Sequence, residues 1–144
     1  MPHPVWIVVA NGSRARLLQR DRPGDALFEV MNWVHPQTRQ HLSPVTGQHR
    51  TSGIGGRSGL AGRQATKDHE RAQFAQDICH WLDSALGRQR IGAIAFFASN
   101  PFLGDLIAHG HGPLRQQLCG SHALDLTSLT LPDLDLRLRA NYQL

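Results

Sequence analysis

Short apolar runs separated by turn residues make up the first part of the chain. Residues 6–10 are aromatic and β-branched, which is typical of a buried strand, and Asn11-Gly12 follows them as a turn. Residues 13–19 and 27–34 alternate apolar and polar positions on either side of a Pro23-Gly24 turn, so we predict three antiparallel strands. Alternation in the third strand places two sets of side chains on opposite faces, Phe28, Val30, Asn32 and Val34 against Leu27, Glu29, Met31 and Trp33.

A long segment that is poor in apolar residues separates these strands from the next periodic pattern. Residues 36–65 are too many for an ordinary connection in a compact domain, and a loop of this length is usually functional or disordered. Helical spacing from residue 66 to residue 86 predicts a helix with Thr66 as its N-cap and Gly87 at its end. Its buried stripe consists of Ala75, Ile78, Cys79, Leu82, Ala85 and Leu86.

The second half of the chain alternates strand and helix patterns. Residues 91–98 form a continuous apolar run, as expected for a central strand that helices cover on both faces. Helices are predicted over residues 102–108 and from Pro113, followed by a short strand at 123–126 and a last helix from residue 131. The prediction is an α/β fold with a mixed sheet of about five strands and flanking helices. Its element order is β-β-β-α-β-α-β-α.

Length and charge narrow the class of protein. The chain has 144 residues, which suits one domain spanning residues 1–144. Its net charge is +4 and its pI is near 10.0. Lys67 is its only lysine, so the other basic residues are arginines, which bind phosphate as a planar fork. A basic surface of this kind suits nucleic acid, although genome base composition explains arginine in place of lysine equally well.

Cysteine usage and hydropathy indicate the compartment. Cys79 and Cys119 are far apart and form no Cys-x-x-Cys pair, so no disulfide framework is expected, and Cys79 is interpreted as a small core residue. The apolar run at residues 5–10 lacks a preceding basic region, and no run approaches the roughly 20 apolar residues that span a bilayer. We therefore expect a cytoplasmic protein with no membrane contact.

Several catalytic classes lack their residues. His109-Gly-His111 is the tightest histidine pair, but no cysteine or acidic cluster accompanies it, so no metal or other cofactor is expected. A nuclease of the two-metal type needs acids at strand ends, whereas the first strand ends at Asn11 and the other acids are scattered. No Gly-x-Ser-x-Gly elbow and no Gly-x-x-x-x-Gly-Lys-Ser/Thr loop is present.

The candidate binding segment is rich in glycine and arginine and leads into the long helix. Gly55-Gly56-Arg57 lies at its centre, with Arg50, Arg63 and Lys67 nearby. One interpretation is a backbone that approaches RNA or a ribosomal surface closely while its cations contact phosphate, with Arg14 and Arg16 on the second strand as further contacts. The other is a solvated loop without a ligand, and the composition does not separate the two.

Three stretches carry a family resemblance. The opening run Trp6-Ile-Val-Val-Ala-Asn-Gly-Ser-Arg-Ala-Arg-Leu-Leu18 resembles the start of the bacterial family named "protein required for attachment to host cells". Lys67-Asp68-His69-Glu70, followed by Phe74-Ala75, resembles the start of that family's central helix, and Ala98-Ser-Asn-Pro-Phe-Leu-Gly104 resembles a later motif. The resemblance covers most of the chain and implies a mixed sheet flanked by helices.

That family in turn resembles the middle domain of archaeal and eukaryotic peptide-chain release factors. The resemblance implies a ribonuclease H-like, release-factor middle-domain-like fold, in which a Gly-Gly-Gln tip precedes a long helix and promotes release of the finished chain. Gly55-Gly56-Arg57 occupies the corresponding place here, with arginine as its third residue. An arginine cannot act as the small neutral amide that helps position the hydrolytic water, so the sequence favours binding over catalysis.

The sequence therefore supports three functions, in this order. The first is a non-catalytic module that binds the ribosome or structured RNA through the Gly/Arg-rich segment. The second is a protein that acts in host-cell attachment or envelope regulation through protein–protein contacts. The third is a hydrolase of peptidyl-tRNA or another ester, and the oligomeric state, including a homo-oligomer, stays open.

Overall fold

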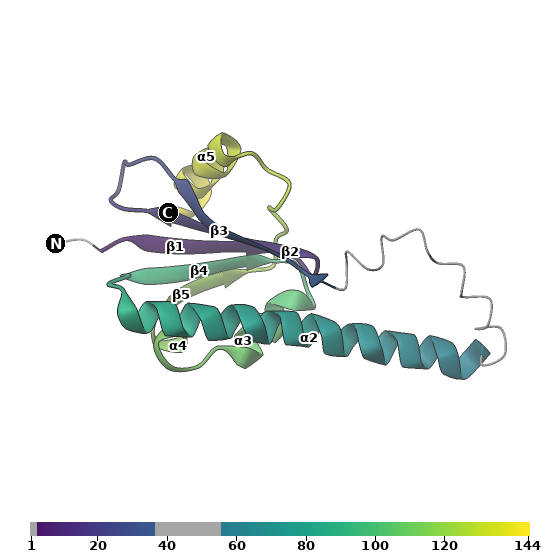
Figure 1. Cartoon of the computed structure of the whole chain (residues 1–144). Helices are drawn as coiled ribbons and strands as arrows, with labels where there is room; N and C mark the ends of the chain where they lie inside the picture. Colours follow the sequence, from purple (N-terminus) through teal and green to yellow (C-terminus); the bar gives the residue numbers. More distant parts are fainter. Residues whose placement is uncertain (1–2, 37–55) are drawn as a thin grey trace.

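Five strands form one mixed sheet in the structure, a computed structural model that describes residues 3–36 and 56–144 (Figure 1). The strands are β1 (Val5–Ala10), β2 (Arg14–Arg20), β3 (Phe28–Val34), β4 (Ala93–Ala98) and β5 (Leu118–His122). Their order across the sheet is β3-β2-β1-β4-β5. The three N-terminal strands pair antiparallel, whereas β4 is parallel to β1 and β5 is parallel to β4. The predicted α/β fold with a five-stranded mixed sheet is confirmed.

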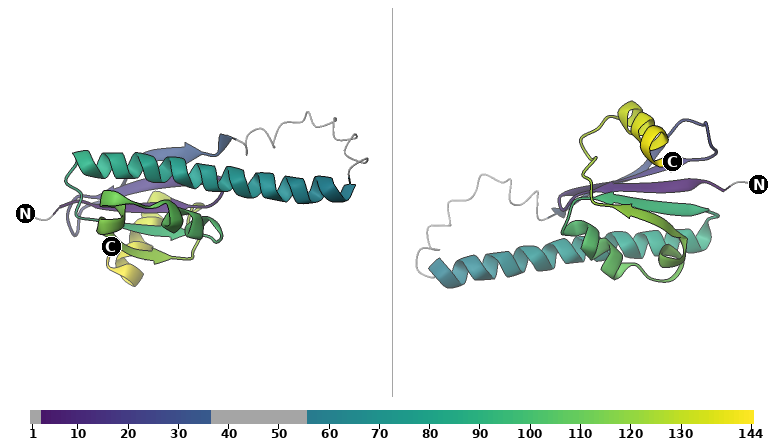
Figure 2. Two further views of the ribbon diagram at one scale, coloured as in Figure 1. Left: turned by 90° about the horizontal axis from the view of Figure 1, so that it is seen from below. Right: turned by 180° about the vertical axis from the view of Figure 1, so that it is seen from behind.

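Helices cover both faces of this sheet (Figures 1 and 2). They are α2 (Gly56–Arg88), α3 (Phe102–His109), α4 (Gly112–Gln117) and α5 (Leu131–Tyr142). The first three pack on the face that carries Trp6, Val8 and Leu17, and α5 packs on the opposite face. Because β1 and β4 lie in the middle of the sheet, almost every residue of both is buried, as the apolar run at 91–98 predicts.

The buried stripe predicted for residues 66–86 is confirmed, since all six of its side chains are buried in the core under α2. Cys79 is one of them, and its thiol donates a hydrogen bond to the carbonyl oxygen of Leu106 at 3.3 Å. Burial raises the pKa of this thiol to about 12. Both cysteines of the chain are free, which agrees with the expected lack of a disulfide framework.

The start of the long helix was predicted wrongly. α2 begins at Gly56, ten residues before Thr66, so Thr66 lies inside the helix and is no N-cap, and the predicted loop ends before residue 56. The apolar stripe begins only at Phe74 in the described side chains, and periodicity therefore could not locate the helix start. Arginine, glutamine, alanine and leucine are good helix formers, and a helix that tertiary contacts have nucleated propagates through such residues.

The last strand was also placed wrongly. It covers Leu118–His122, whereas the predicted residues 123–126 follow it as an irregular segment. Parallel pairing with β4 fixes the strand here, with Leu118 opposite Ile94 and His122 opposite Phe97. Leu126, the last residue of the predicted strand, is buried against α5 from outside the sheet.

A β-bulge overturns the predicted alternation in β3. Met31 pairs with Leu17, but Glu29 pairs with Leu18, so Val30 is the extra residue. The bulge brings Glu29 to the same face as Asn32, and the Asn32 amide donates a hydrogen bond to the Glu29 carboxylate. Glu29 can therefore accept hydrogen bonds from Arg16 on the neighbouring strand, at 2.8 and 3.2 Å.

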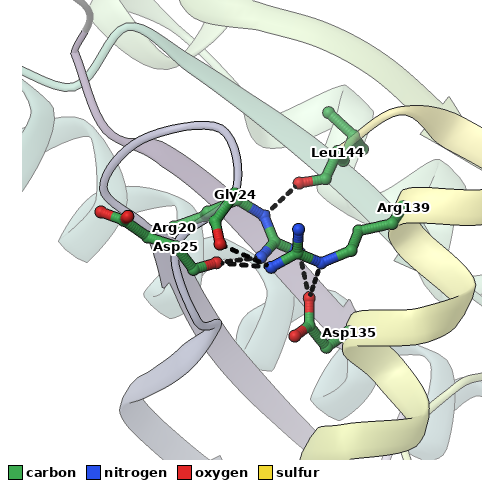
Figure 3. A network of polar contacts seen from close by, with 6 residues as sticks. All are labelled: Arg20, Gly24, Asp25, Asp135, Arg139 and Leu144. Carbon is green, nitrogen blue, oxygen red and sulfur yellow. Dashed lines mark hydrogen bonds and ion pairs between the residues drawn. The ribbon is translucent and has the colours of Figure 1, made fainter.

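Two arginines fasten α5 to the β2–β3 hairpin (Figure 3). Arg20 of β2 donates to Asp135 Oδ1 and to the carbonyl oxygens of Asp25 and Leu144, each at 2.5 Å. Arg139 donates to the same Asp135 oxygen at 2.8 Å and to the Asp25 carbonyl at 2.7 Å. Burial alone would raise the pKa of Asp135, but the hydrogen bonds and charges of both arginines outweigh it and hold this pKa below its ordinary value.

A carboxylate of α2 caps α4. Gly112, the first residue of α4, has φ +52°, and the backbone N–H of Leu114 donates to Asp83 Oδ1 at 3.2 Å. A methyl group at Gly112 would lie 2.9 Å from that oxygen, which is too close for a carbon atom. Glycine is thus required at this position both by its backbone conformation and by the approach of Asp83.

Asp135→Asn should lower the free energy of unfolding by about 1–3 kcal/mol at pH 7, because Arg20 and Arg139 both lose the negatively charged carboxylate that they bind. The pKa of Asp135 is depressed in the folded state, so its contribution is complete at neutral pH and is lost as the pH falls below about 4. Urea unfolding of the variant and the wild type at pH 7 and below about pH 4 should therefore show a difference in the free energy of unfolding that is smaller at the acidic pH. Asp133→Asn, an exposed acid on the same helix, is the control, and an equal deficit there would contradict the role of Asp135.

Gly112→Ala should lower the free energy of unfolding by about 1–3 kcal/mol, because the positive φ and the contact with Asp83 both oppose a Cβ. Gly104→Ala is the matched control, since this glycine is exposed on α3 and a Cβ there would meet nothing within 4 Å. The control should gain about 0.5–1 kcal/mol in denaturant unfolding. Equal stability of the two variants would show that Asp83 does not constrain α4.

Candidate functional site

The first part of α2 projects beyond the sheet (Figures 1 and 2). We call residues 56–67 the α2 extension. Residues 62–67 are all exposed, and the first buried side chain in the described part of the helix is Phe74, at 5% exposure. Residues 62–67 contribute nothing to either core, in contrast to the second half of the same helix, which packs along the sheet.

Arg71 holds the helix where it leaves the domain. Its Nε donates to Asp105 Oδ2 of α3 at 2.6 Å, and its Nη1 donates to Asp68 Oδ1 at 2.9 Å. The Arg71 stem also passes Gly12 in the β1–β2 turn, where a Cβ would lie 3.7 Å from it. The hydrogen bond to Asp105 is the largest of the effects that raise the pKa of Arg71. These contacts fix the direction of the extension relative to the sheet.

The structure brings together only part of the predicted RNA-binding set. Arg63 and Lys67 lie one helical turn apart on the extension, and both are exposed. Gly56 and Arg57 form the start of α2, but the placement of the Arg57 side chain lies outside the description. Arg50 and Gly55 fall outside the described residues.

The two predicted contacts on β2 differ from each other. Arg14 is exposed at the start of the strand, at the edge of the sheet from which the extension projects. Arg16, in contrast, is only 6% exposed, and its Nη1 donates to the carbonyl oxygens of Thr127 and Leu129 at 3.1 and 2.7 Å. Together with its ion pair to Glu29, these bonds engage the Arg16 guanidinium within the domain, and its contact with a ligand stays a prediction.

Asn11 organises the carboxyl edge of the central strands. Its Oδ1 accepts hydrogen bonds from the backbone N–H groups of Ser13 and Arg14 at 2.8 and 3.0 Å, and these bonds stabilise the β1–β2 turn. Its amide donates to Asp125 Oδ2 at 3.0 Å and to the Thr127 hydroxyl at 3.1 Å. Ligands of open α/β sheets bind at this kind of edge, so these side chains occupy a position suited to contact.

Asp125 is the acid at this edge that sequence reasoning missed. Burial would raise the pKa of Asp125, but hydrogen bonds from Thr127 and Asn11 and the charge of Arg14 lower it below its ordinary value. Asp125 was overlooked because residues 123–126 were predicted to form a strand. The Asp125-x-Thr127 spacing is the available sequence signal, since it is typical of a local side-chain cap at a turn.

An open pocket of about 320 Å³ lies between the end of β3 and the middle of α2. It is lined by His35, Pro36, His69, Glu70, Gln73, Phe74 and Asp77. His35 stacks on Phe74, with ring centroids 4.8 Å apart, and both side chains are buried. Gln73 donates to Asp77 Oδ1 at 3.0 Å along the helix surface.

The described ranges 3–36 and 56–144 contain no group of three or more histidine, cysteine, aspartate or glutamate side chains that could hold a metal ion. No helix among them is both long and apolar enough to cross a membrane.

Asn11→Asp should replace a hydrogen bond by two facing carboxylates and lower the free energy of unfolding by about 1–3 kcal/mol at pH 7. Repulsion raises the pKa of the pair in the folded state, so the deficit should narrow as the pH falls toward about 5. Urea unfolding across this range is the measurement. The double variant Asn11→Asp with Asp125→Asn should recover stability at pH 7, and a deficit that ignores pH would refute the contact.

The family model "Protein required for attachment to host cells" matches residues 6–138 of the chain. No curated protein matches the chain at a significant level. The matched range contains the whole sheet except Val5, the helices α2 to α4 and most of α5, including the Asn11 turn and the Arg71 contacts. The chain therefore belongs to the family of proteins required for attachment to host cells.

Proposed function

We propose that this protein is a non-catalytic binding module that contacts structured RNA, and ribosomal RNA in particular, through the α2 extension. The observation that carries the proposal is the exposure of residues 62–67 on a helix that has left the core. A helix that buries no apolar stripe gains little from its own domain, and a surface partner is a sufficient reason for such an extension.

The charges on the extension favour a polyanion as that partner. Arg63 and Lys67 lie at positions i and i+4, so they share one side of the helix, and two like charges at this spacing repel each other by a few tenths of a kcal/mol. Within the described ranges neither side chain forms an ion pair or a side-chain hydrogen bond. Asp68, the next acid along the helix, is paired with Arg71. A phosphate backbone would relieve the repulsion and use both cations.

The choice of ribosomal RNA rests on the sequence. In the sequence, Gly55-Gly56-Arg57 resembles the release-factor tip that precedes a long helix. Arginine in its third position favours a contact with phosphate and does not supply the neutral amide of a hydrolytic site. Arg14, exposed at the adjacent edge of the sheet, is a candidate for an additional phosphate contact.

The test compares two charge-matched double variants. Arg63→Ala with Lys67→Ala removes the cations of the extension, whereas Arg88→Ala with Arg90→Ala removes two exposed cations at the other end of α2. Binding to purified ribosomes and to a fluorescent RNA hairpin is measured by co-sedimentation and anisotropy at about 50 and about 200 mM salt. Each lost phosphate contact should reduce the slope of log affinity against log salt by about 0.9.

We expect the first pair to weaken binding and flatten its salt dependence, and the second pair to leave both close to wild type. If the two pairs weakened binding equally, the interaction would depend only on the net charge of the protein, and the α2 extension would be rejected as the contact surface. Affinity for ribosomes that does not change with salt would reject phosphate recognition altogether.

A second candidate is a role in attachment through protein–protein contacts, as the family description suggests. Exposed apolar side chains on strand β3 favour it, since an interaction surface of this kind suits a protein partner better than a nucleic acid.

A further inference from the structure

A small pocket of about 170 Å³ opens beside α3 and α4, on the face of the sheet that α2 also covers. Its apolar walls come from β4, α3, α4 and β5 and consist of Phe96, Leu106, Ile107, Leu114 and Leu118. Phe96, Leu106 and Leu114 are at most 1% exposed, whereas Ile107 is 37% exposed. The pocket therefore reaches from an exposed rim to side chains of the core.

The size and chemistry of these walls suit one apolar ring. Apart from Arg115, none of the lining side chains carries a polar group, and water is held poorly where it finds no polar partners. The volume is close to the roughly 150 Å³ of an apolar cavity that holds one benzene molecule in another protein. Phe96 supplies an aromatic side chain against which a ring can pack.

Arg115 supplies the one charged group of the lining. Its Nη1 donates a long hydrogen bond, of 3.4 Å, to the carbonyl oxygen of Gly110, so the guanidinium is held against the pocket wall. Within residues 3–36 and 56–144 Arg115 forms no ion pair. A guanidinium has five N–H donors in a planar fork that matches a carboxylate, and most of those of Arg115 are available to a ligand.

The charges around the pocket do not cancel that of Arg115. The four elements that form its walls contain two aspartate, glutamate, lysine or arginine residues, Asp105 and Arg115. Asp105 is paired with Arg71 at 2.6 Å. Asp83 approaches α4 from α2, where it accepts the backbone N–H of Leu114 as a cap. The mouth of the pocket is thus positively charged and complements an anion.

We propose that this pocket binds a small aromatic carboxylate, a single ring that carries one carboxylate group. The ring packs among Phe96, Leu106 and Leu114, and the carboxylate pairs with the guanidinium of Arg115. A ring without a charge would leave the guanidinium to water, and a bare anion would leave the apolar walls unfilled. The site shares no residue with the α2 extension and is separate from the RNA contact proposed above.

The test follows the methyl signals of the lining leucines and of Ile107 by NMR while the full chain is titrated with sodium benzoate. Benzyl alcohol has the ring without the charge, and acetate has the charge without the ring. We expect benzoate to shift these signals with a low-millimolar Kd. Benzyl alcohol should bind about two- to fivefold more weakly, which is the usual contribution of an exposed ion pair, and acetate should leave the signals unchanged.

A substitution of the charge should act on benzoate alone. Arg115→Gln should weaken benzoate to the level of benzyl alcohol, because the amide replaces the ion pair by a neutral contact. Arg90→Gln is the matched control, since Arg90 is an exposed cation between α2 and β4 and does not line the pocket. This control should bind both compounds like wild type.

A substitution in the wall should act on both compounds. A Cβ at Gly110 would lie 3.5–3.7 Å from atoms of Leu106, Ile107 and Leu114, which is ordinary contact, and the φ of −79° suits alanine. Gly110→Ala should therefore fold, narrow the pocket and weaken benzoate and benzyl alcohol alike. Gly104→Ala, where a Cβ meets nothing within 4 Å, is the matched control and should bind like wild type.

Equal affinity for benzoate and benzyl alcohol, or undiminished benzoate binding by Arg115→Gln, would overturn the proposal. Shifts confined to methyl groups outside the pocket, or unchanged binding by Gly110→Ala, would overturn it as well. A peptide ending in phenylalanine that bound more than about tenfold more tightly than benzoate would assign the site to a protein partner instead. None of these outcomes depends on RNA binding by the α2 extension.

Discussion

The burial of β1 and β4 on both faces is the constraint on which the rest of the structure depends. Two adjacent parallel strands with almost no exposed residue require helices above and below them. On one side α2 meets this need together with α3 and α4, and Trp81 packs between Trp6 and Trp33 with ring centroids 6.0 and 5.5 Å away. On the other side α5 is the only helix in the described part of the chain. Burial of that face therefore depends on the contacts of α5 through Arg20, Asp135 and Arg139.

Sequence patterns correctly predicted the strands and helices whose apolar residues recur at a regular spacing. Apolar runs and turn residues identified four of the five strands, and helical spacing identified the half of α2 that packs on the sheet. The same patterns failed for the elements whose bounds depend on tertiary contacts. No periodic apolar pattern in the sequence marks residues 56–65 as helix, and the described side chains among them are exposed. The parallel pairing of Leu118 with Ile94 depends on a strand far away in the chain.

The candidate site shows the same division. Arg63 and Lys67 could be recognised from composition, since their exposure follows from their polar surroundings. The burial of Arg16 could not, because it depends on the carbonyl groups of Thr127 and Leu129, more than one hundred residues later in the chain. Asp125 likewise became visible only when the fold brought it to Asn11. The bulge at Val30 was unreadable in the sequence for a related reason, as it is defined by the register with β2.

The continuity of α2 has a geometric consequence for any contact made by its free end. At 1.5 Å per residue, residues 56–67 reach about 18 Å beyond the point where the helix meets the domain, so a partner surface can be recessed and still be touched. Each residue also turns the helix by about 100°, and Arg71 sets the origin of that rotation through Asp105 and the Gly12 turn. The number of residues between Arg71 and each of Arg63 and Lys67 thus sets the direction in which these two side chains point around the helix axis. A rigid spacer of this kind transmits angle as well as distance, which a flexible linker of the same length does not.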